Sequence, residues 1–139
     1  MEINEHIRGI DACSSEIACR PEVFGQAFRY LSDTMVVCKE TRRHRTQTRY
    51  KTRSLHTTYH AGEDFFDIVD GLRAIDESLL FCGLKRGSRL GHALALGIAP
   101  EEYYRLKGVK LVLAKQIVLD DVVWMLSKAD EFGCQVSGS

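Results

Sequence analysis

Two short histidine-containing segments hold the residues best suited to chemistry. His60 ends a strand-like run and is followed by Gly62 and Glu63, and His92 ends a second such run at Arg89-Leu90-Gly91-His92. A histidine at the end of a strand can bind zinc through a neutral ring nitrogen. A glutamate three residues later could donate a proton over the same pocket if burial raises its pKa.

Each segment, taken alone, also fits a purely structural role. His60 and His92 fit hydrogen-bonded core histidines, and Glu63 fits a helix-start residue that interacts favourably with the helix dipole. In the functional interpretation, Ala61 and Gly62 have little bulk, so a substrate can approach the backbone. His92 would orient or deprotonate a metal-bound water. The two segments together favour a single site.

The elements expected around these segments alternate between strand and helix. Strands are expected at 7–12, 54–59 and 89–92, with a possible fourth at 109–113. Helices are expected from apolar residues at helical spacing, and from two prolines at helix starts, at 21–31, 65–81, 100–106 and 117–131.

This alternation predicts an α/β fold with a parallel sheet. In such folds the chemistry lies at the carboxyl ends of the strands. Asp11, His60 and His92 all fall at or near expected strand ends. That shared position is the strongest indication, from the residues alone, that they form a site.

The composition indicates one soluble domain in a reducing compartment. The chain has 139 residues and a formal net charge of zero, so nothing attracts the whole molecule to nucleic acid or membrane. No apolar run approaches the about 18 residues that span a bilayer. The five cysteines are odd in number and lack Cys-x-x-Cys spacing, so we expect buried, reduced thiols and a cytoplasmic protein.

A basic stretch from Thr41 to Arg53 is expected to be a solvated loop inserted between a helix and a strand. It contains no acidic residue, and its basic residues are Arg42, Arg43, Arg45, Arg49, Lys51 and Arg53. A contact with RNA or phosphate is the alternative interpretation. Tyr50 is its only aromatic residue, which gives little support for base stacking.

Three motifs carry a resemblance to the adenosine deaminase family of metal-dependent hydrolases, which are (β/α)8 barrels. They are Gly9-Ile10-Asp11, Tyr59-His60-Ala61-Gly62-Glu63 and Arg89-Leu90-Gly91-His92. The chain resembles most closely the divergent adenosine deaminase-like subunit of RADAR-type antiphage defence systems, with weaker similarity across 106–126. The resemblance spans most of residues 1–139 and implies about the middle half of a TIM-like barrel with parallel strands.

The resemblance implies hydrolytic deamination of adenosine, or of a related purine nucleoside or nucleotide, to the inosine form. His60 would be one zinc ligand, Glu63 would protonate the purine ring, and His92 would position the attacking water. Three further residues are implied near the substrate: Asp11, Gly62 and Ser14.

The chain departs from the family at its zinc ligands and at two glycines. It has no His-x-His pair and no strand-ending Asp-Asp, because Asp120-Asp121 lies in a helical pattern and is expected on a helix surface. The family's glycines at two positions correspond to Ser14 and Ala93.

These departures predict a fragment that is inactive by itself. A full barrel needs roughly 250 residues, and open strand edges invite association. We therefore expect either a homo-oligomer or missing barrel segments to complete the site. The alternative is a non-catalytic α/β module that binds RNA or a partner subunit.

Overall fold

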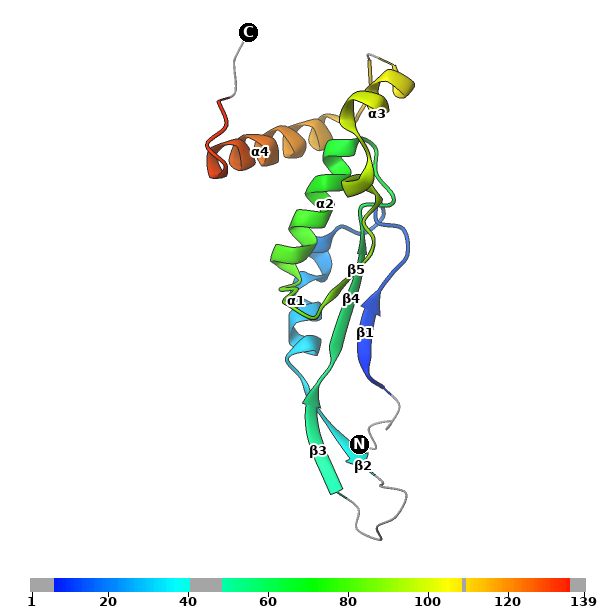
Figure 1. The fold of residues 1–139 in the computed structure, drawn as a ribbon, viewed down its shortest axis with the longest axis vertical. Coiled ribbons are helices and arrows are strands. Elements are labelled where there is room, and N and C mark those ends of the chain that lie inside the picture. The colour runs from blue at the N-terminus through cyan, green and yellow to red at the C-terminus, as the bar shows by residue number, and fades with distance from the viewer. Residues whose placement is uncertain (1–6, 41–48, 109, 136–139) are drawn as a thin grey trace.

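A computed structural model describes residues 7–40, 49–108 and 110–135 (Figure 1). In chain order its elements are β1 (Gly9–Ala12), α1 (Pro21–Ser32), β2 (Met35–Glu40), β3 (Arg49–Ser54), β4 (His56–Ala61), α2 (Ile68–Phe81), β5 (Arg89–His92), the short 3-10 helix η1 (Leu94–Gly97), α3 (Pro100–Lys107) and α4 (Lys115–Glu131).

A three-stranded parallel sheet positions the candidate site. β4 lies in the middle and pairs with β1 on one side and β5 on the other. Asp11 is in register with Thr58, and His60 with Gly91. Because the strands are parallel, their carboxyl ends lie at one edge of the sheet. The predicted α/β class and the parallel pairing are confirmed.

The helices α1 and α2 both pack on the same face of this sheet (Figure 1). Burial alternates along β4, so Tyr59 and Ala61 point into the core and His60 points to the opposite face. Phe28 of α1 meets Tyr59 edge to face, with ring centroids 5.6 Å apart. The core therefore lies between the sheet and the helices, and His60 projects from the other side.

The expectation of a loop at 41–53 is wrong for residues 49–53, which belong to the strand β3, whereas residues 41–48 lie outside the described residues. β2 and β3 pair as an antiparallel ribbon along their full length. Only Leu55 separates β3 from β4, so the ribbon extends from the amino-terminal end of β4, away from the candidate site (Figure 1). Arg42, Arg43 and Arg45 lie outside the described residues.

Most other expected elements are confirmed with shifted ends. The expected helix 65–81 begins at Ile68, the helix 117–131 begins at Lys115, and the strand 54–59 lies at 56–61. The strand expected at 109–113 is wrong. Residues 110–114 have no regular structure, and residue 109 lies outside the described residues. An apolar run forms a strand where a neighbouring strand can satisfy its backbone hydrogen bonds. The Val112 residue of this run is instead 99% exposed to solvent.

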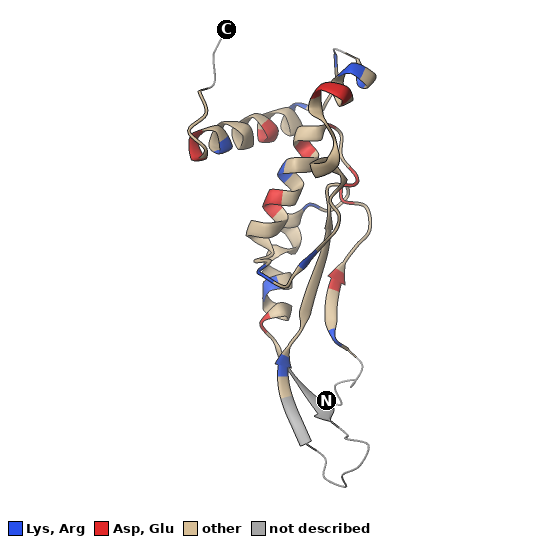
Figure 2. Cartoon of the chain, viewed as in Figure 1, with Lys and Arg blue, Asp and Glu red and all other residues tan. Residues whose placement is uncertain are grey.

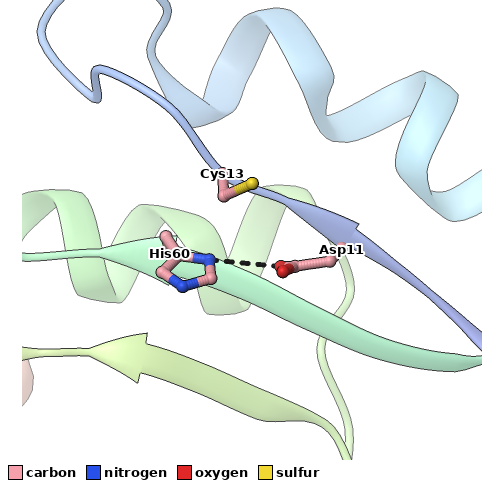
Figure 3. A group of neighbouring side chains, drawn as sticks. All are labelled: Asp11, Cys13 and His60. Carbon is pink, nitrogen blue, oxygen red and sulfur yellow. Dashed lines mark hydrogen bonds and ion pairs between the residues drawn. The ribbon is translucent and has the colours of Figure 1, made fainter.

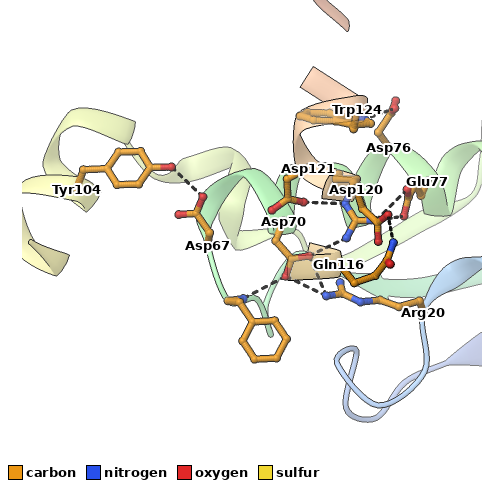
Figure 4. A network of polar contacts seen from close by, with 12 residues as sticks. Arg20, Asp67, Asp70, Asp76, Glu77, Tyr104, Gln116, Asp120, Asp121 and Trp124 are labelled. Carbon is orange, nitrogen blue, oxygen red and sulfur yellow. Dashed lines mark hydrogen bonds and ion pairs between the residues drawn. The ribbon is translucent and has the colours of Figure 1, made fainter. Parts of the chain in front are cut away.

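Buried charged side chains join α4 to α2 (Figure 4). Arg73 of α2 donates to Asp121 of α4 at 2.8 Å and to Asp70 at 3.0 Å, and all three residues are buried. Arg20 also donates to Asp70, at 2.8 Å. Asp121 was expected on a helix surface. The helix is confirmed and the surface position is wrong, because Arg73 draws this carboxylate inward. Burial raises the pKa of Asp121, and Arg73 opposes that rise.

The described cysteine side chains differ in burial; Cys19 is partly buried, and the side chain of Cys38 lies outside those described. Cys82 is buried, as expected, and burial raises its pKa to about 11. Cys13 and Cys134 are exposed, so the expectation of buried thiols is wrong for them. Within the described ranges, no helix has the length and apolar character needed to cross a membrane.

Substituting Asp121 by alanine should strongly destabilise the protein. The change leaves the buried Arg73 guanidinium without one of its carboxylate partners, so the free energy of unfolding should fall by about 3 kcal/mol. Urea unfolding measures this loss. Asp120→Ala is the matched control, because Asp120 only accepts a surface hydrogen bond from Gln116, and its effect should stay within about 0.5 kcal/mol. Equal losses in the two variants would contradict the expectation.

Candidate functional site

His60 is held by two hydrogen-bond acceptors at the end of β1. Its Nδ1 lies 3.1 Å from the Asp11 carboxylate (Figure 3). The same nitrogen lies 3.3 Å from the Ala12 carbonyl. Because both partners accept, a neutral His60 carries its proton on Nδ1 and keeps a lone pair on Nε2. Metal-binding histidines are commonly oriented in this way by a carboxylate.

Gly91 makes room for the His60 ring. The two residues are cross-strand partners, and a Cβ added at Gly91 would collide with the ring atoms Cδ2 and Nε2. Glycine is therefore required at this position by the close approach of an imidazole. The sequence motif that suggested a site thus has a direct packing reason for one of its residues.

The loop after β4 and the last residue of β5 bring Glu63 and His92 together. His92 Nε2 lies 3.0 Å from the Glu63 carboxylate. The rings of His60 and His92 have centroids 5.3 Å apart. Three of the expected site residues therefore lie at one edge of the sheet, and Asp11 joins them through His60.

Glu16 is a site residue that sequence reasoning missed. Its buried carboxylate accepts the backbone N–H of Gly62 at 2.6 Å and that of Glu63 at 2.9 Å. Charge-assisted hydrogen bonds of this kind are stronger than neutral ones, so Glu16 fixes the turn that carries Glu63. No local pattern marks it, because its partners lie 46 and 47 residues away.

Gly62 and Ser14 occupy different surroundings from one another. Gly62 has φ +80°, and the space a side chain would need there is filled by Ile75 of α2. Ser14 lines a cavity of about 160 Å³ together with Cys13 and His60. Pockets for drug-sized ligands span roughly 300–1,000 Å³. This cavity is therefore too small to enclose a nucleoside by itself.

Among the described residues, three that are not glycine have positive φ: Ser14 (131°), His92 (54°) and Ala93 (48°). A side chain makes positive φ unfavourable, at a cost of roughly 1–2 kcal/mol per residue. Such backbone strain tends to gather at functional sites. All three residues follow the carboxyl ends of β1 and β5 or lie at them, close to His60.

Charges of both signs are interspersed on α2, α3 and α4 (Figure 2). These three helices therefore lack the predominance of Lys and Arg that is typical of nucleic-acid-binding elements. No family model matches the chain, and no curated protein matches it either. The site is interpreted below from its own geometry and from the motifs that compose it.

Substituting Gly91 by alanine should displace the His60 ring. The added methyl group collides with the imidazole, so unfolding should become easier by about 1–3 kcal/mol. NMR of the histidine ring nitrogens should also show loss of the Nδ1–H tautomer. Gly97→Ala is the control, since nothing lies within 4 Å of its added Cβ, and it should change stability by no more than about 0.5 kcal/mol. An unchanged His60 signal in Gly91→Ala would refute this account.

Proposed function

We propose that this chain carries part of the site of a zinc-dependent, adenosine deaminase-like hydrolase that acts on a purine nucleoside or nucleotide. His60 is the zinc ligand, Glu63 the proton donor to the purine ring, and His92 the residue that positions water. Asp11, Gly62 and Ser14 lie on the substrate side. The close grouping of His60, Glu63 and His92 is the observation that carries the proposal.

The winding of the sheet supports a barrel sector. The strands β1, β4 and β5 lie side by side in the order in which they occur along the chain, with the β2–β3 ribbon inserted between β1 and β4, and α1 and α2 lie on one face. Crossovers between parallel strands are almost always right-handed, so strands added in one direction keep their helices on one side. A (β/α)8 barrel is wound in this way, whereas a doubly wound sheet reverses direction.

The backbone at two substituted glycine positions gives independent support. The resemblance implies glycine at 14 and 93, and the residues there, Ser14 and Ala93, both have positive φ. Glycine adopts such φ values without steric cost. The chain therefore keeps a glycine-like backbone conformation at positions where the family has glycine and this sequence does not.

The residues present fit zinc only in part. The lone pair on His60 Nε2 suits it as a ligand, and Asp11 orients the ring. Catalytic zinc sites typically have three protein ligands, and the chain has neither the His-x-His pair nor the strand-ending Asp-Asp that the resemblance implies. Zinc, when bound, would supply Lewis-acid activation of water.

The chain's own residues position protons at the reacting edge. His92 Nε2 lies 3.0 Å from the Glu63 carboxylate and pairs with it when the imidazole is protonated, so the two groups are within reach of proton transfer. When a purine ring nitrogen takes the place of His92 beside Glu63, a proton on Glu63 can pass to that nitrogen. Glu16 keeps Glu63 in place through the backbone.

Restoring glycine at positions 14 and 93 should stabilise the protein. Ser14→Gly and Ala93→Gly each relieve a side chain from a disfavoured positive φ, so each should raise the free energy of unfolding by about 0.5–1 kcal/mol. The net gain is reduced by the greater entropy of unfolded glycine. Chemical denaturation measures the change.

Ala18→Gly is the control for this pair. Ala18 lies in the same loop as Ser14 but has no positive φ, so glycine should destabilise by about 0.4–1 kcal/mol there. If all three variants lost stability alike, the glycine-like backbone at 14 and 93 would no longer support the proposal.

Adenosine should bind selectively at the grouped residues. Titration with adenosine, followed by amide NMR, should shift Gly62, Glu63 and His92 more than titration with cytidine does. Glu63→Ala should raise the dissociation constant for adenosine by about tenfold, as expected for loss of a hydrogen bond to a charged group.

Glu101→Ala provides the matched control, because Glu101 is an exposed acid in the first turn of α3. It should leave adenosine binding unchanged. Equal shifts with cytidine, or adenosine binding that survives Glu63→Ala, would count against a purine site.

A further inference from the structure

Asp11, Cys13 and His60 form a second grouping, which adds Cys13, a residue with no role in the proposed function. One potential ligand atom from each residue lies within 4.8 Å of the others (Figure 3). Asp11 and Cys13 are two residues apart at the end of β1, so strand alternation puts them on the same side. His60 comes from the neighbouring strand, on the face away from the helices.

We propose that the chain by itself binds a zinc-class divalent metal ion through the Asp11 carboxylate, the Cys13 thiolate and the Nδ1 of His60. Carboxylate, thiolate and imidazole are all ligands of Zn²⁺, and thiolate with imidazole favours Zn²⁺ or Co²⁺ over Mg²⁺. The set supplies three protein ligands and leaves one position for water or another group.

The distances suit a tetrahedral ion with small side-chain movements. Zinc bonds of about 2.0–2.3 Å place ligand atoms about 3.3–3.6 Å apart. The Asp11 oxygen and His60 Nδ1 are already 3.1 Å apart. Asp11 and Cys13 are exposed, so rotation of their side chains can move the ligand atoms by about 1 Å without disturbing the core.

The local charge also suits a divalent cation. Carboxylate and thiolate together carry two negative charges around a neutral imidazole, which balances the ion. Among the described residues, no lysine or arginine forms an ion pair with Asp11. Its carboxylate can therefore give up its hydrogen bond with His60 and bind the metal instead. The metal then takes the place of the proton on His60 Nδ1.

This metal site stands on its own geometry and does not depend on deaminase chemistry. In the proposed hydrolase, His60 binds zinc through Nε2 and Asp11 only orients the ring. In the metal site proposed here, the ion lies on the Nδ1 side and Asp11 binds it directly. The two arrangements assign different roles to Cys13, and that difference makes them separable by experiment.

Cobalt(II) titration of the reduced 139-residue chain tests the proposal. One cobalt ion per chain should bind and produce a thiolate-to-cobalt charge-transfer absorption. Cys13→Ser should abolish that absorption and weaken cobalt binding by more than about tenfold, because loss of a ligand costs at least as much as loss of its outer-shell support. Cys134→Ser, at a second exposed thiol, should change neither.

Asp11→Asn gives a second measure that preserves side-chain size. It should weaken cobalt binding and retain the thiolate absorption. Absence of cobalt binding, an absorption that survives Cys13→Ser, or an unchanged cobalt affinity in Asp11→Asn would each overturn the proposal. Thermal unfolding of the metal-free variants confirms that each remains folded. Adenosine binding is scored separately, so a failed purine site and a failed metal site are distinguishable.

Discussion

The in-register parallel pairing of β4 with β1 and β5 is the constraint on which the rest of the site depends. It sets His60 beside Asp11 on one strand and opposite Gly91 on the other. A shift of one residue would turn His60 into the core and Tyr59 out of it. The apolar contact between Phe28 and Tyr59 therefore secures the register, and the register in turn arranges the polar groups on the far face.

Much of this arrangement was predictable from local sequence patterns. Helical spacing of apolar residues and strand-ending histidines predicted the α/β class and three residues that do lie together: His60, Glu63 and His92. Glu16 and Asp121 escaped prediction because their burial arises from partners more than 40 residues away. The β2–β3 ribbon was missed because β3 consists largely of basic and polar residues, which indicated a loop.

Two kinds of attachment hold the elements around the sheet. α1 and α2 join it through apolar packing around Phe28, Tyr59 and Ile75. α4 joins α2 largely through the ion pair of Arg73 with Asp121 and the hydrogen bond from Trp124 to Asp76, at 2.8 Å each. Buried ion pairs give directional fixation but little net stability. These contacts therefore determine the orientation of α4 but add little to the free energy of unfolding.

The polar face of the sheet constrains what can cover it. One register row runs across Asp11, Thr58 and Arg89, and the next places His60 beside Gly91. An apolar surface packed against these rows would desolvate their polar groups without offering them hydrogen bonds, at a cost of several kcal/mol. Any close neighbour on this side, whether protein or small molecule, must therefore be polar or leave a hydrated gap. The polarity of this face therefore limits which surfaces can cover it, before any specific contact forms.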